Sequence, residues 1–178
     1  SGIRNPSYFL EREDRGFIDN FFGGLLTTSG LNNIGSPCQD ATGRKYGLHG
    51  EMTNIPADEI SVNQYWEDDE LYFEVKATMH HSRFYGEDIL FQRTISTALG
   101  SGKFTIHDVI ENLDFKEFPL FFLYHINFGF PLVSENSRII CSCSVEELTP
   151  RTKFASSRID KAFSFESPID QMEEECFY

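Results

Sequence analysis

The sequence has little positive charge and no long hydrophobic run. Its 178 residues include 15 Lys or Arg against 28 Asp or Glu, which gives a formal net charge of −13. Nucleic acids and anionic membranes are bound through basic faces, so neither is an expected partner. No apolar run approaches the roughly 20 residues of a membrane-spanning helix. The first residues, Ser1 to Arg4, show no hydrophobic signal-peptide core.

Sequence signatures of several enzyme classes are also missing. No GxSxG, no phosphate-binding loop and no HxH or CxxC pair with metal-ligand spacing occurs. We therefore expect no cofactor and no metal. Of the four cysteines, Cys141 and Cys143 are two residues apart in an alternating segment, and such neighbours on one strand are poorly placed for a disulfide. We expect reduced thiols in a cytoplasmic protein.

Aromatic and apolar residues are plentiful. Hydrophobic residues make up 40% of the chain and aromatic residues 15%. Disordered chains are poor in both kinds of residue, so intrinsic disorder is excluded. The length suits one domain with a sizeable core. Without a repeat or a linker in the sequence, we treat residues 1–178 as a single domain.

The middle of the chain alternates apolar and polar residues, as half-buried strands do. Apolar side chains occupy every second position of residues 71–77, and residues 60–66 show a similar stripe interrupted by Gln64. The acidic segment between them is typical of a turn. A turn centred on Asp68 and Asp69 pairs Trp66 with Leu71 and Val62 with Val75, so both apolar stripes lie on one face.

A second hairpin is predicted around Gly100-Ser101, a dipeptide that suits a two-residue turn. The resulting register pairs Ile95 with Ile106 and places Arg93 opposite Asp108 on an otherwise apolar face. A charge there is costly unless it is paired, so we predict a cross-strand ion pair. Its role is either structural or, for Arg93, to bind a polar ligand.

Two further segments extend the strand pattern. Residues 119–128 are apolar on both faces, which predicts a strand covered on both sides. Residues 137–146 alternate again, and a short helix is expected only near residues 158–163. The sequence therefore predicts an all-β protein, an antiparallel β-sandwich.

Histidines are the main candidates for chemistry. His125 lies near the end of the apolar strand and shares a face with Asn127. It is either part of a site or a core histidine bonded to Asn127 or a backbone carbonyl. Glycines flank His49, which permits either close approach to a ligand or only a turn. We expect the remaining three, His80, His81 and His107, on the solvated surface.

Several motifs, taken in order along the chain, resemble the uncharacterised bacterial branch of the galactose mutarotase (aldose 1-epimerase) superfamily. The string Tyr-His-x-Asn-x-Gly-x-Pro is the most specific of them. The resemblance rests on residues 22–31 (FGGLLTTSGL), 47–50 (GLHG), 55–57 (IPA), 93–95, 108–112 and 123–132 (LYHINFGFPL).

The resemblance implies a large β-sandwich that binds a sugar without metal or nucleotide. In these enzymes a carboxylate removes the proton of the anomeric hydroxyl and a histidine protonates the ring oxygen, so the ring opens and recloses on either face. By motif, His125 corresponds to the acid and His49 to a second histidine near the ring oxygen. Asn127, Arg93 and Thr28 correspond to sugar contacts.

The catalytic base has no counterpart in this sequence. In the family it is a Glu that precedes Pro on a late strand, and no Glu-Pro occurs here. We therefore expect a partial mutarotase-like domain that by itself shows little or no catalysis and that self-associates through exposed sheet edges. Catalysis by this chain alone would require another carboxylate, such as Glu51 or Glu175, as the base. Two functions stay open, an aldose 1-epimerase-like isomerase acting on a hexose or related sugar, and a carbohydrate-binding module that lacks the base.

Overall fold

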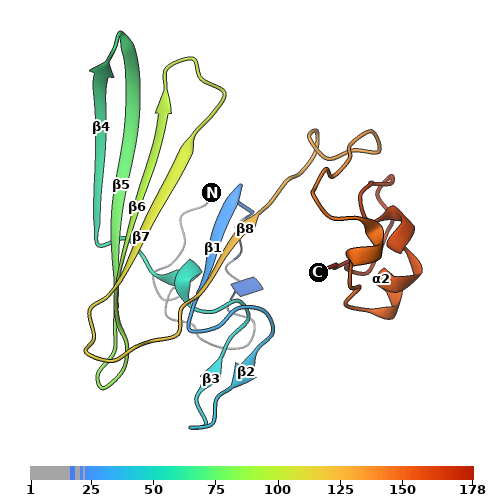
Figure 1. Cartoon of the computed structure of the whole chain (residues 1–178), viewed down its shortest axis with the longest axis horizontal. Helices are drawn as coiled ribbons and strands as arrows, with labels where there is room; N and C mark the ends of the chain where they lie inside the picture. The colour runs from blue at the N-terminus through green and yellow to red at the C-terminus, as the bar shows by residue number, and fades with distance from the viewer. Residues whose placement is uncertain (1–16, 19–20, 22) are drawn as a thin grey trace. The chain divides into compact units, whose positions relative to one another are not determined.

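The computed structural model describes residues 17–18, 21 and 23–178. Contacts divide the chain into two compact units, Ser1–Ile126 (unit 1) and Asn127–Tyr178 (unit 2). Unit 1 holds the strands labelled in Figure 1. They are β1 (Leu26–Leu31), β2 (Cys38–Gln39), β3 (Lys45–Tyr46), β4 (Glu59–Glu67), β5 (Glu70–Ser82), β6 (Asp88–Ala98), β7 (Thr105–Asn112) and β8 (Phe121–Ile126).

The largest sheet is antiparallel with strand order β4-β5-β6-β7. Both predicted registers are confirmed, since Trp66 pairs with Leu71 across β4 and β5, and Ile95 pairs with Ile106 across β6 and β7. The first turn forms as expected, with positive φ at Asp68 and Asp69. The prediction of a two-residue turn at Gly100-Ser101 was wrong, because the pairing of β6 with β7 already ends at Ser96 opposite Thr105 and leaves a longer loop.

A second, two-stranded sheet consists of β1 and β8, which run antiparallel. It contributes Leu31 to the buried core, where Leu31 joins Met52 of the short helix η2 (Met52–Asn54) and Ile89 and Phe91 of β6. The prediction that residues 119–128 are covered on both sides was wrong. Phe121, on one face of β8, and Tyr124 and Ile126, on the other, are exposed, so neither face is covered along its whole length.

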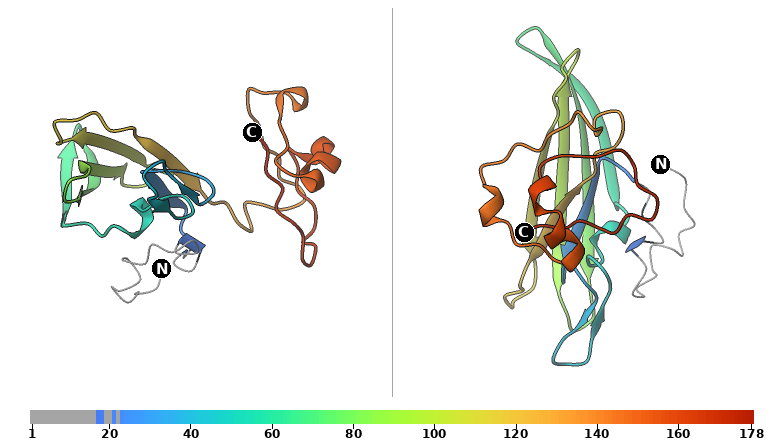
Figure 2. Two further views of the ribbon diagram at one scale, coloured as in Figure 1. Left: turned by 90° about the horizontal axis from the view of Figure 1, so that it is seen from below. Right: turned by 90° about the vertical axis from the view of Figure 1, so that its right-hand side faces the viewer.

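The apolar face of the four-stranded sheet is covered over only part of its length. Ile89 and Phe91, on the half of β6 nearest the core, are buried. Further along the same face Ile60, Val62 and Trp66 of β4 are exposed. Figures 1 and 2 show the hairpin tips at residues 67–70 and 99–104 extending beyond the β1–β8 pair.

Unit 2 has little regular structure. It contains the helix α2 (Lys153–Ser157) and the 3-10 turns η3 (Val145–Glu147) and η4 (Ile159–Lys161). The strand expected over residues 137–146 is absent, and Arg138 makes only an isolated bridge to Ser164. The helix begins earlier than predicted because Thr152 caps it, its side chain accepting a hydrogen bond from the Ala155 amide.

The predicted fold class is confirmed, since the regular structure of the described residues is mostly antiparallel strand, with one short helix. Within the described residues no helix combines the length and the apolar character needed to cross a membrane.

Candidate functional site

A backbone junction positions His49. Gly30 at the end of β1 donates its amide to the His49 carbonyl at 2.9 Å, and the Glu51 amide donates to the Gly30 carbonyl at 3.2 Å. The His49 amide donates to the Gly35 carbonyl at 2.9 Å. These bonds fix the loop that carries His49 against β1, with His49 itself at a φ of 57°.

Two glycines make this junction possible. A Cβ on Gly50 would lie 2.4 Å from the Gly30 carbonyl oxygen and 2.6 Å from that of Asn33. A Cβ on Gly30 would lie 2.1 Å from the carbonyl oxygen of Phe121. Both glycines also adopt positive φ. The sequence left open whether the glycines flanking His49 permit close approach to a ligand or only a turn. Gly50 instead permits the close approach of two backbone segments.

The strand β8 brings His125 to the same place. The ring centroids of His49 and His125 are 5.6 Å apart, with the ring planes at 75°. Phe17 contacts both rings, at 4.8 Å from His49 and 5.8 Å from His125. Both imidazoles, here called the histidine pair, are half-buried, and each can therefore reach solvent as well as the neighbouring ring.

A backbone hydrogen bond sets the tautomer of His49. The Gly35 amide donates to His49 Nδ1 at 3.2 Å. A nitrogen that accepts a hydrogen bond carries no proton, so neutral His49 has its hydrogen on Nε2. In that form His49 presents an N–H donor at the outer end of its ring.

Strand pairing decides which β1 side chains share a face with His125. Thr27 lies directly opposite His125, and Thr28 lies opposite Tyr124. Successive side chains on a strand point to opposite faces, so Thr27 and Ser29 share the His125 face and Thr28 does not. The Ser29 hydroxyl is buried without a hydrogen-bond partner among the described residues. Thr27 and Ser29 were missed, and only knowledge of the β1–β8 register could have found them.

Arg93 lies on the other side of β8. It forms the predicted ion pair, donating to both oxygens of Asp108 at 2.8 and 2.7 Å. The Tyr124 hydroxyl donates to the same carboxylate at 2.6 Å. Since Tyr124 and His125 point to opposite faces of β8, the structure does not bring Arg93 together with the histidine pair.

Burial would raise the pKa of Asp108, but the bonds from Arg93 and Tyr124 outweigh it and lower the pKa. The ion pair therefore ties β6 and β7 to β8. A structural role for Arg93 accounts for these contacts.

A buried carboxylate, Glu87, forms the largest polar cluster that the sequence did not reveal. Arg44 donates to both of its oxygens, at 3.0 and 3.4 Å, and His81 Nε2 lies 3.2 Å away. With its amide turned to fit both neighbours, Asn32 donates to Glu87 at 3.1 Å and accepts from Arg44 at 3.0 Å. The expectation that His81 is a surface residue was wrong, because Glu87 holds it in this cluster.

Comparison with known proteins identifies the family. A family model described as "Domain of unknown function (DUF4432)" matches residues 1–178. This chain belongs to the DUF4432 family. None of the curated proteins matches the sequence significantly.

A solved structure relates this DUF4432 chain to the mutarotase-like fold. It is a crystal structure of a "putative aldose 1-epimerase" from Klebsiella pneumoniae subsp. pneumoniae MGH 78578, with a TM-score of 0.87 and 24% identity. The match covers 97% of the DUF4432 chain and 44% of the other chain. The present chain therefore spans less than half the length of that protein, and the two share the fold over this part.

The carboxylates considered as substitute bases have cationic neighbours in this DUF4432 chain. Glu51 lies two residues after His49 and 4.0 Å from the Arg44 guanidinium. Glu175, in unit 2, is paired with Arg158. Among the described residues no group of three or more His, Cys, Asp or Glu is arranged to hold a metal ion. Asn127 directly follows β8 as the first residue of unit 2, and its role stays a prediction.

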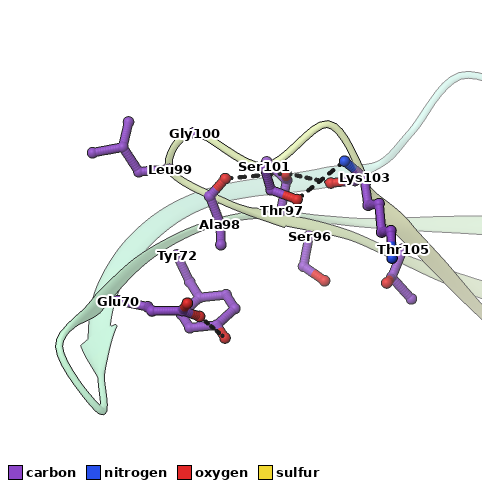
Figure 3. Close-up of a pocket in the computed structure, with 10 residues that line it drawn as sticks. All are labelled: Glu70, Tyr72, Ser96, Thr97, Ala98, Leu99, Gly100, Ser101, Lys103 and Thr105. Atoms are coloured by element: carbon purple, nitrogen blue, oxygen red, sulfur yellow. Dashed lines mark hydrogen bonds between the residues drawn. The ribbon is translucent and has the colours of Figure 1, made fainter.

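A hollow of about 440 Å³ lies at the tip of the β6–β7 hairpin. Figure 3 shows that its polar groups bond mainly to one another, with Tyr72 donating to Glu70 at 2.9 Å and the Thr97 hydroxyl donating to the Lys103 carbonyl at 2.6 Å. None of the predicted site residues lines it. The histidine pair is therefore the candidate site.

Proposed function

We propose that this chain carries the histidine side of a sugar site in an aldose 1-epimerase-like isomerase. The observation that supports it most directly is the 5.6 Å approach of His49 and His125, two residues from separate motifs of the family resemblance. The fold shared with the Klebsiella protein described as an aldose 1-epimerase adds to this support. The substrate class is a hexose or a related sugar.

The proposed chemistry is general acid–base catalysis of ring opening. His125 gives a proton to the ring oxygen while a carboxylate takes the proton of the anomeric hydroxyl. The bond between the anomeric carbon and the ring oxygen breaks, a carbonyl forms at the anomeric carbon, and reclosure on the other face reverses both transfers. His49, with its hydrogen on Nε2, donates to a sugar oxygen beside the ring and orients it.

Sugar binding to the purified chain tests the proposal. Ligand-observed NMR with a panel of neutral aldoses should detect binding, and His49→Ala or His125→Ala should each weaken it about tenfold or more, the expected cost of a lost hydrogen bond of 1.5 kcal/mol or more. His107→Ala is the matched control, since His107 is an exposed histidine on β7. Absence of binding across the panel, or equal effects of all three variants, would reject the sugar site.

A second candidate is a carbohydrate-binding module without catalysis. It is favoured by the cationic neighbours of Glu51 and Glu175, which hold both carboxylates in ion pairs. Saturation transfer between the α and β anomers separates the two functions. Exchange above the buffer rate that disappears in His125→Ala indicates the isomerase with a base inside this chain, and binding without added exchange means that this chain by itself acts only as a binding module.

A further inference from the structure

Two cysteines of unit 2 place their sulfur atoms closer together than ordinary van der Waals contact. Cys141 Sγ and Cys143 Sγ are 2.9 Å apart, and both residues are exposed. The other two cysteines, Cys38 and Cys176, form no disulfide. The sequence argument against a disulfide assumed that Cys141 and Cys143 share a strand, and the structure removes that assumption.

The backbone on both sides holds the two cysteines in this arrangement. Before them, the Ile139 amide donates to the Phe163 carbonyl at 2.9 Å. After them, Ser144 and Glu147 form a capping box, in which the Ser144 amide donates to the Glu147 carboxylate at 2.8 Å. Residues 140–143 therefore form a short irregular segment that is fixed at each end, and both thiols project from it to the same side.

The sulfur separation favours a disulfide over a metal chelate. Two thiolates on one tetrahedral zinc ion, with Zn–S bonds of about 2.3 Å, lie about 3.8 Å apart. A disulfide bond is about 2.05 Å long. At 2.9 Å the sulfurs are already closer than a shared zinc ion allows, and about 0.9 Å of further approach closes the bond.

We propose that Cys141 and Cys143 form a reversible dithiol–disulfide site that exchanges with low-molecular-weight disulfides. One thiolate of the pair attacks the small disulfide, forms a mixed disulfide with one half of it and releases the other half as a thiol. The second cysteine then attacks the mixed disulfide, closes the Cys141–Cys143 bond and releases the second thiol. The pair loses two electrons and two protons, and the small disulfide is reduced to two thiols.

The contact between the sulfurs also affects their reactivity. Hydrogen bonding with Cys141 raises the pKa of the Cys143 thiol. The exchange begins when one thiol of the pair loses its proton, because thiolates attack disulfides and thiols do not. Glu146 and Glu147 lie three and four residues after Cys143, and their negative charges disfavour anionic oxidants.

A neutral redox buffer of bis(2-hydroxyethyl) disulfide and 2-mercaptoethanol tests the proposal on the whole chain. After equilibration, acid quenching and alkylation, peptide mapping should show Cys141 and Cys143 joined, with dithiothreitol restoring both thiols. The closure constant should be at least about tenfold larger in the native protein than in urea, because the fold holds the sulfurs together and sequence proximity alone does not.

Matched single-thiol variants provide the controls. Cys141→Ser and Cys143→Ser should each leave one thiol that stops at the mixed disulfide, and Cys38, exposed on β2, should behave in the same way in the wild type. Separate mixed disulfides on Cys141 and Cys143, disulfides between chains, or a closure constant no larger in the native protein than in urea would each overturn the proposal.

Discussion

Gly50 shows how one residue without a side chain positions a candidate catalytic group. Its φ of 76° suits glycine, and any Cβ there would lie 2.4 Å from the Gly30 carbonyl oxygen. Gly100 has nearly the same φ, 77°, but open space around the position of its Cβ. An alanine at Gly100 would therefore meet backbone strain alone, whereas an alanine at Gly50 would meet strain and steric overlap.

We expect Gly50→Ala to lower the free energy of unfolding by about 3 kcal/mol or more, through strain plus overlap. Gly100→Ala should cost only about 1 kcal/mol, for strain alone. Chemical denaturation followed by fluorescence measures both values. Equal losses in the two variants would mean that the junction between β1 and the His49 loop relaxes at little cost.

Polar contacts between elements replace apolar packing at two places in unit 1. The Asp108 carboxylate joins β6, β7 and β8, and Glu87 joins the end of β6 to the β2–β3 hairpin through Arg44. Burying a carboxylate is favourable only when such partners satisfy it. These clusters orient the short strands β2 and β3 and, through the chain that follows β3, the loop of His49.

The Glu87 cluster predicts a specific loss of stability in acid. Burial alone would raise the pKa of Glu87, but hydrogen bonds from Arg44 and His81 outweigh it and lower the pKa to about 2, from its ordinary value of 4.5. A lowered folded-state pKa stabilises the protein above the unfolded value, and this stabilisation disappears as the pH falls from about 4.5 to about 2.

We expect Glu87→Gln to reduce the free energy of unfolding at pH 7 by about 1–3 kcal/mol, because Arg44 and His81 lose a charged partner. The variant should also lose less stability than the wild type between pH 5 and pH 2. Urea denaturation across this pH range measures both effects, and Glu59→Gln on the exposed strand β4 is the control. If Glu87→Gln lost as much stability between pH 5 and pH 2 as the wild type, Glu87 would not be the group responsible for the acid sensitivity.

Within unit 1, part of the apolar face of the four-stranded sheet is exposed. On β4, Val62 is 76% exposed and Trp66 is 69% exposed. Contiguous apolar surface of this kind promotes association. The first strand, β4, is moreover at an edge of the sheet.

We expect the chain to self-associate with increasing concentration through this face, as measured by light scattering coupled to gel filtration. Ile60→Lys with Val62→Lys should weaken association about tenfold or more, because both side chains lie on the apolar face. Ser61→Lys with Asn63→Lys adds the same charge to the opposite face of β4 and should leave association nearly unchanged. Equal effects of the two pairs would indicate pairing through the strand edge or a general charge effect instead.

The sequence by itself determined the all-β class, the registers of the two long hairpins and the Arg93–Asp108 ion pair. Period-two alternation and turn residues act between neighbours along the chain, so a local reading suffices. The motifs around His49 and His125 were also visible, although their roles stay predictions.

Only the tertiary structure decided which face of β8 each side chain occupies, why His81 is buried, and that two sulfurs meet in unit 2. Glu87 and Arg44 are 43 positions apart in the sequence, and all four strands of the largest sheet lie between β1 and β8 along the chain. Contacts of this kind depend on how distant segments pack and on which polar groups that packing buries, and no local pattern encodes either.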